Sequence, residues 1–149
     1  MHSQIRNWRD LPGGPWRLLA TTEQTGGMFI VGEARMDPGA PAPAKHVHTH
    51  EDENVYIVEG VLTVEIGDER LEARAGDFVT LPRGVPHVFA NLSDELVRTI
   101  GVIAPTGIEG MFREQEAYFA TLSGPPDMGR LAEIAGRYGV HFAGPPLTR

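Results

Sequence analysis

Three histidines within five residues are the feature of this sequence that points most directly to chemistry. His46, His48 and His50 occupy alternate positions, and the acidic residues 51–53 follow them at once. In an extended strand, side chains two residues apart point to the same face, so these imidazoles would lie together. Imidazoles beside a carboxylate form a nitrogen and oxygen ligand set that suits Mn, Fe, Co, Ni, Cu or Zn. The cluster therefore predicts a transition-metal site.

A further histidine lies in a second stretch that is rich in turn residues. Residues 76–91 are GDFVTLPRGVPHVFAN, in which glycine and proline bound a short strand and a tight turn. This turn would place His87 at the start of the following strand. On its own, His87 is equally compatible with an ordinary half-buried histidine. Its partnership with the first cluster makes it a candidate ligand.

The composition limits the other functions that this chain could have. It has 149 residues and no cysteine, which excludes disulfides, thiolate zinc sites and a thiol nucleophile. The net charge is −7 and the 13 basic residues are scattered, which argues against nucleic acid as a partner. The N-terminus lacks a signal-peptide pattern, and no apolar run approaches the roughly 20 residues that span a bilayer. We therefore expect a cytoplasmic protein with no membrane partner.

The elements that must position the histidines are short strands. From Met28 to Ala104 the sequence consists of brief extended runs separated by turn residues, and residues 61–66 alternate as a half-buried strand does. Turn signals about every 8–12 residues, with no helical period, predict a β-sandwich or barrel. The predicted strands are 28–36, 54–60, 61–66, 69–75, 76–82, 87–92 and 96–104.

The pattern changes after Pro105, where apolar residues recur at helical spacing. One helix is predicted within residues 110–122 and a second within 127–139, with Asp127 as its N-cap and Gly139 as its end. We expect both helices to pack on the outside of the β domain. The predicted organisation is an N-terminal segment packing on the barrel (1–26), the barrel itself (27–106) and a C-terminal helical tail (107–149).

The two histidine stretches resemble the two motifs of the cupin superfamily, G-x5-H-x-H-x3-4-E-x6-G and G-x5-P-x-G-x2-H-x3-N. The second motif matches without a gap from Gly76 to Asn91. The first matches from His46 to Gly60, although Gly39 lies six residues before His46 in place of five. The resemblance implies an all-β fold, the cupin double-stranded β-helix or jelly-roll barrel, with a short C-terminal helical extension.

The resemblance also implies which residues hold the metal. One divalent transition metal per chain would be bound by His46, His48, Glu53 and His87. His50 would lie beside the site or on the surface, with a place among the ligands as the alternative, and Glu51 and Asp52 would be solvated turn residues. In a cupin the metal lies inside the barrel, so we expect strand side chains to line an apolar pocket. The candidates are His50, Tyr56, Phe78 and Phe89, together with Phe29, Val31, Val58 and Val102, although core packing would explain the same apolar residues.

The small bacterial cupins that this chain resembles most are quercetin-dioxygenase-like, with a closing segment similar to residues 138–146. This resemblance implies oxygenation of a flavonol-like, enolisable aromatic or diketone, with Glu53 as ligand and general base. The same ligand set also resembles that of metal-dependent lyases, cyclases and isomerases of natural-product metabolism, in which the metal is a Lewis acid. A non-catalytic binding or sensing module is the remaining alternative. We expect a small-molecule substrate and a homodimer.

Overall fold

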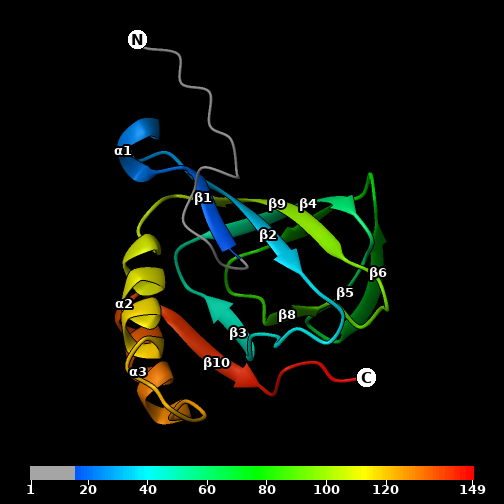
Figure 1. Cartoon of the computed structure of the whole chain (residues 1–149). Helices are drawn as coiled ribbons and strands as arrows, with labels where there is room; N and C mark the ends of the chain where they lie inside the picture. The colour runs from blue at the N-terminus through cyan, green and yellow to red at the C-terminus, as the bar shows by residue number, and fades with distance from the viewer. Residues whose placement is uncertain (1–15) are drawn as a thin grey trace.

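The computed structural model describes residues 16–149 and consists of two packed antiparallel sheets with helices along one side (Figure 1). The predicted jelly-roll fold is confirmed. The first sheet has the order β1 (Trp16–Ala20), β2 (Ile30–Met36), β9 (Val97–Ala104), β4 (Asp52–Glu59) and β7 (Phe78–Leu81). The second has the order β10 (Val140–Gly144), β3 (Lys45–His48), β8 (His87–Ala90), β5 (Val61–Ile66) and β6 (Glu69–Arg74).

Alternation along the strands explains why the two sheets pack face to face. In β9, every second residue from Val97 to Ile103 is buried, and the residues between them are partly exposed. This is the period of a strand with one face in the core. The buried side chains form one cluster between the sheets, which consists of Val55, Ile57, Leu62, Val64, Ala73, Leu81 and Val97.

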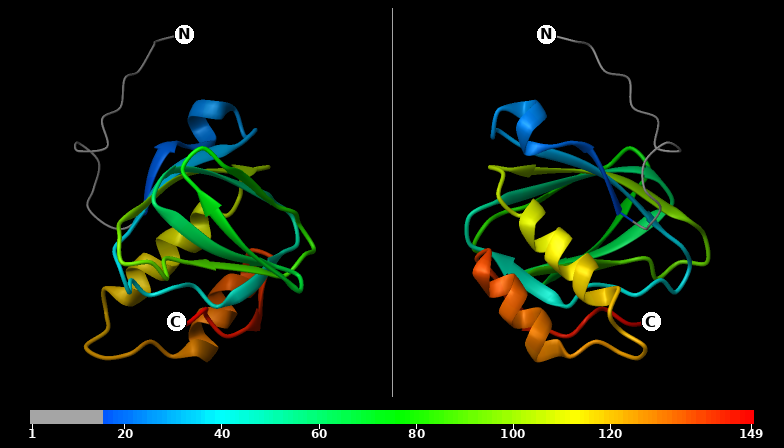
Figure 2. Two further views of the ribbon diagram at one scale, coloured as in Figure 1. Left: turned by 90° about the vertical axis from the view of Figure 1, so that its right-hand side faces the viewer. Right: turned by 60° about the vertical axis from the view of Figure 1, so that its left-hand side comes forward.

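Helices α2 (Glu109–Phe119) and α3 (Met128–Arg137) lie side by side next to the sheet edges β1 and β10 (Figures 1 and 2). Asp127 caps α3, because its carboxylate accepts hydrogen bonds from the backbone of Gly129 and Arg130. Every helix in the described part of the chain lacks the length and apolar character that a membrane crossing requires. A second core cluster joins the helices to both sheets and consists of Ile30, Ile103, Ile108, Met111, Ile134, Ala135 and Val140.

The structure extends the barrel beyond the predicted range 27–106 at both ends. Strand β1 lies in the predicted N-terminal segment and pairs with β2, while β10 lies in the predicted helical tail and pairs with β3. A short helix, α1 (Thr22–Thr25), follows β1. The part of the predicted 1–26 segment that precedes residue 16 lies outside the described residues.

Two residues of the family motifs have structural roles. Gly60 has a φ of 81°, and a Cβ atom there would lie 2.4 Å from the Leu96 carbonyl oxygen, so the turn from β4 to β5 requires glycine. Asn91 directly follows β8, and its side-chain amide donates to the carbonyl oxygens of Met36 and Glu95. Both residues therefore fix connections between strands.

Candidate metal centre

The four predicted ligands come together inside the barrel. His46 and His48 lie on β3, His87 begins β8 and Glu53 lies on β4 of the facing sheet. One ligand atom from each of the four lies within 4.8 Å of the others. His87, His48 and Glu53 are 0%, 3% and 7% exposed, and His46 is partly buried. Charged and polar groups buried this deeply need partners, which is why this cluster is a candidate functional site.

Backbone pairing places the three histidines against one another. His46 lies opposite His87, which is the one register pair between β3 and β8. The turn before β8 is tied to the same strand, since the Gly84 amide donates to the His48 carbonyl oxygen at 2.8 Å. The other edge of β3 pairs with β10, where Val140 lies opposite His48. Strand β3 is therefore held on both sides, and its alternation directs both of its histidines inward.

The orientation of the imidazole rings suits metal binding. The Nδ1 atom of His46 lies 2.8 Å from the Ala44 carbonyl oxygen, and that of His87 lies 3.1 Å from the Val85 carbonyl oxygen. A ring that donates from Nδ1 to a carbonyl carries its lone pair on Nε2, the atom that is then free to bind a metal. The two rings are thus held in the tautomer that a ligand requires.

The unsatisfied atoms at the centre of the cluster fit a metal ion. Among residues 16–149, the buried Nε2 atoms of His48 and His87 have no hydrogen-bond partner, and each lies 3.5 Å from Glu53 Oε2. Metal bonds to nitrogen and oxygen are about 2.0–2.2 Å long, so opposite ligands are about 4.2 Å apart. The observed spread of 4.8 Å is close to this value. The donor set therefore fits a divalent transition metal, and binding itself stays a prediction.

The protonation states of the metal-free cluster follow from burial and from the neighbouring charges. Burial alone would raise the pKa of Glu53, but the imidazoles of His48 and His87 beside its carboxylate lower this pKa to about 2. Burial would lower the pKa of His48, yet Glu51 and Glu53 raise it to about 9. Burial dominates at His46 and lowers its pKa to about 4. His48 is therefore the protonated partner of the Glu53 carboxylate at neutral pH.

The prediction for the acidic turn was wrong at Glu51. This residue is 3% exposed, and its carboxylate lies against His48, because the chain turns back onto the barrel directly after β3. Asp52 does reach the surface, where it pairs with Arg83 at 2.9 Å. His50 is exposed and outside the ligand cluster, because β3 ends at His48 and the alternation ends with it.

Two of the predicted pocket residues lie on the wrong face of the first sheet. Glu53 and Val55 point into the barrel, so Tyr56 points outward and is 44% exposed. Phe78 lies opposite Tyr56 in the register and is 62% exposed. Phe89 packs against the core on the inner side of the second sheet. Val31 and Val102 point to the outer face of the first sheet and are half-buried. The last two candidates, Phe29 and Val58, are exposed.

Trp16 is an aromatic residue of the inner face that sequence reasoning missed. Cβ atoms added to Gly32 and Gly101 would meet its ring at 2.1 and 3.4 Å, and Gly101 lies opposite Val55 on the same face as Glu53. Its ring packs at 5.7 Å from the ring of Phe112 on α2. The two glycines are the available signal, since glycine within a strand often marks a close approach.

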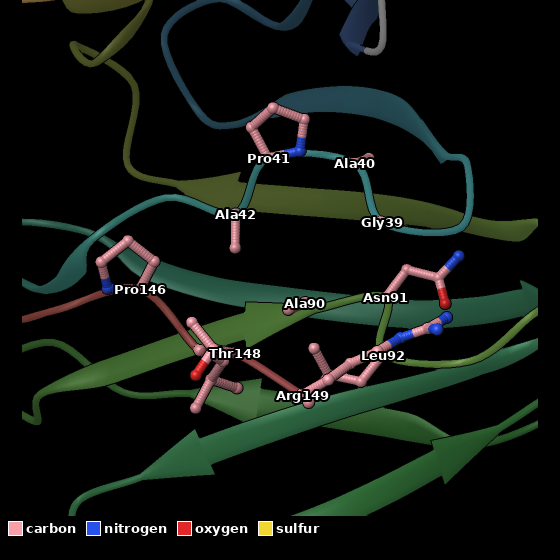
Figure 3. Close-up of a pocket in the computed structure, with 11 residues that line it drawn as sticks. Gly39, Ala40, Pro41, Ala42, Ala90, Asn91, Leu92, Pro146, Thr148 and Arg149 are labelled. Carbon is pink, nitrogen blue, oxygen red and sulfur yellow. The ribbon is translucent and has the colours of Figure 1, made fainter.

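A cavity of about 390 Å³ lies on a different part of the molecule (Figure 3). It is bounded by the loop of residues 39–42, by residues 90–92 and by the C-terminal residues 146–149. None of the four candidate ligands lines it. We therefore assign it no part in the chemistry of the histidine cluster.

The fold and the cluster together define a class of protein: an antiparallel double-sheet barrel with three histidines and one glutamate directed to its interior. A family model described as "Cupin domain" matches residues 32–103. The chain belongs to the cupin superfamily, as the two sequence motifs predicted.

The chain also resembles individual proteins. "Polyketide synthase CurC" of Streptomyces cyaneus is 34% identical over 94 residues, which cover 62% of this chain and 60% of that protein. "Protein SchB" of Streptomyces halstedii is 32% identical over 97 residues, which cover 62% of this chain and 70% of that protein. The solved structure of the polyketide cyclase RemF from Streptomyces resistomycificus has a TM-score of 0.62 at 20% identity. That match covers 71% of this chain and 81% of RemF, and it is a likeness of fold.

Proposed function

We propose that this chain is a metal-dependent cyclase that acts on polyketides. The observation that carries the proposal is the buried cluster of three histidines and Glu53, in a chain that is 34% identical to a protein named polyketide synthase. The match covers only 60% of that protein, so the activity of the whole relative is part of the proposal. These findings support the cyclase alternative better than the quercetin-dioxygenase-like activity predicted first.

The chemistry of a polyketide suits a buried carboxylate beside a Lewis acid. Such a chain carries CH₂ groups between two carbonyls, and ring closure joins one of these carbons to a carbonyl carbon with loss of water. A bound divalent metal would polarise the substrate carbonyl oxygen. Glu53 is the candidate base for the two CH₂ hydrogens, the first removed as the C–C bond forms and the second as the C=C bond forms; it would pass both to the attacked carbonyl oxygen, which leaves as water. The reaction needs no oxidant, in contrast to an oxygenase.

Trp16 supports an aromatic or poly-carbonyl substrate. Its ring occupies the inner face of the barrel over Gly32 and Gly101, beside Phe112. The indole N–H is buried without a hydrogen-bond partner among the described residues. A flat, unsaturated substrate could stack on this ring, and a substrate carbonyl could accept its N–H.

Elemental analysis tests the metal requirement. We expect one transition metal per chain in the purified protein, and its loss from His48→Ala and His87→Ala. His50→Ala is the matched control, because His50 is exposed and lies outside the cluster. Full metal content in both ligand variants would remove the metal centre from the proposal.

The reaction itself is tested with a synthetic poly-β-keto thioester as the probe. A cyclase should convert it to ring-closed products that have lost water, at the same rate with and without dioxygen. The His87→Ala variant should be inactive. Oxygen consumption with incorporation of both oxygen atoms into the product would overturn the cyclase in favour of the dioxygenase.

A further inference from the structure

The three imidazoles of the cluster share one arrangement, and one of them differs in its outer partner. Each ring turns Nε2 to the centre and Nδ1 to an acceptor outside it. For His46 and His87 this acceptor is a backbone carbonyl oxygen two residues earlier in the chain. For His48 it is the carboxylate of Glu51, whose Oε2 lies 3.4 Å from Nδ1.

The two atoms of this third contact are both buried and unsatisfied. Within the described part of the chain, His48 Nδ1 and Glu51 Oε2 have no hydrogen-bond partner. Their separation of 3.4 Å exceeds the 2.7–3.2 Å of a good N–H···O bond, so a small rotation of the ring would complete the bond. Burying a carboxylate without a partner destabilises the fold, and His48 Nδ1 is the partner that lies within reach of Glu51.

Charge balance points to the same role. Three neutral histidines and Glu53 supply only one negative charge, and a divalent cation carries two positive charges. Glu51 is the second buried carboxylate in contact with the cluster, since Asp52 is partly exposed and paired with Arg83. A buried ion is tolerated when its charge is compensated nearby. Glu51 and Glu53 together would balance the metal.

We propose that Glu51 is a positioning residue for the metal: it accepts the Nδ1 hydrogen of His48, holds the Nε2 lone pair toward the ion and supplies the second negative charge. The inference rests on the metal centre of the proposed function. A carboxylate that orients a ligating histidine in this way typically changes metal affinity by about 10–100-fold. Glu51 touches no substrate atom in this role.

The test compares zinc binding by the wild type, Glu51→Ala and Glu51→Gln, using competition with a chelator at the high-pH limit, where proton competition no longer contributes. We expect Glu51→Ala to bind zinc about 10–100-fold more weakly. Glu51→Gln keeps an oxygen acceptor but loses the charge, so its affinity should fall between the two. Asp52→Asn is the charge-matched control and should bind zinc as the wild type does.

A spectroscopic readout separates positioning from a merely structural role. In the zinc-loaded wild type, nitrogen-detected NMR should show a slowly exchanging Nδ1 proton on His48, which Glu51→Ala loses and Glu51→Gln retains. Unchanged affinity and an unchanged ring proton in Glu51→Ala would overturn the inference, as would a loss of thermal stability alone. A wild type that binds no zinc overturns the metal centre and this inference together. Normal zinc binding without cyclisation would overturn only the proposed reaction.

Discussion

Val140 of β10 lies directly opposite His48 of β3 in the antiparallel register. Val140 is 2% exposed and belongs to the cluster that joins helices α2 and α3 to the sheets. Because β3 shares only one register pair with β8, β10 is the neighbour that supports most of the histidine strand. The C-terminal extension is thus part of the support of the candidate metal centre.

This relationship predicts that a packing defect in β10 weakens metal binding. Val140→Ala should lower the free energy of unfolding by about 1–3 kcal/mol, because it leaves a small cavity next to β3. It should also weaken zinc binding several-fold, since β3 can shift. Val97→Ala is the matched control: the same change at 0% exposure, in the other core cluster. Val97→Ala should lower the free energy of unfolding in urea by a similar amount without changing zinc affinity. If both variants weakened zinc binding equally, the prediction would be contradicted.

Much of the fold and the ligand set could be predicted, because the strands show local patterns and the histidine stretches resemble known motifs. The alternation in residues 61–66 is readable one strand at a time. The choice of His46, His48, Glu53 and His87 came from the resemblance to the two cupin motifs. What could not be predicted depends on tertiary pairing. Strand β10 is five residues long and follows a helix, so nothing local identifies its partner.

The errors at Glu51 and Tyr56 have the same origin. A charged residue next to turn residues normally lies in solvent, whereas the fold buries Glu51 against His48. Strand alternation establishes that Tyr56 and Val55 face opposite sides but does not tell which side is the interior. The orientation follows once Glu53 is known to face the histidines, because Tyr56 is three residues further along the same strand.

If Trp16 forms a wall of the substrate site, its removal should affect binding of the substrate more than binding of the metal. We expect Trp16→Leu to raise KM for an aromatic poly-β-keto probe by about 3–10-fold, which corresponds to the binding free energy of one aromatic contact. Its zinc content should be unchanged, because Trp16 is not a ligand. Phe119→Leu, which removes an exposed aromatic side chain from α2, should change neither quantity. A Trp16→Leu enzyme with unaltered KM would exclude the ring from the substrate site.

The homodimer expected from the sequence stays a prediction, and the outer face of the first sheet offers a place to test it. Tyr56 and Phe78 form an exposed aromatic pair there, and exposed apolar groups of this kind often mark an interface. Phe78→Ser should shift the chain from dimer to monomer in light scattering, with its thermal stability nearly unchanged. Leu71→Ser, at an exposed apolar position of the other sheet, should remain dimeric. A wild-type monomer would contradict the expectation directly.

The pKa of His48 sets the pH dependence of metal binding and of stability, in opposite directions. Because this pKa is raised from 6.5 to about 9, the metal must displace a proton from His48 at neutral pH. Zinc affinity should therefore rise about tenfold per pH unit from neutral pH up to the pKa of His48, about 9. In the metal-free protein the raised pKa stabilises the fold fully below pH 6.5, and this contribution is lost as the pH rises through about 9.

Both trends can be measured on the same samples, by chelator competition for zinc affinity and by urea unfolding of the metal-free protein. Glu51→Gln should flatten the stability trend, because it removes one of the two carboxylates that raise the pKa of His48. Asp52→Asn should leave the trend intact, since Asp52 pairs with Arg83 and is not among the causes of the His48 shift. Zinc affinity that is independent of pH from 6 to 8 would mean that His48 is already neutral, and that the Glu51 and Glu53 carboxylates do not hold its proton.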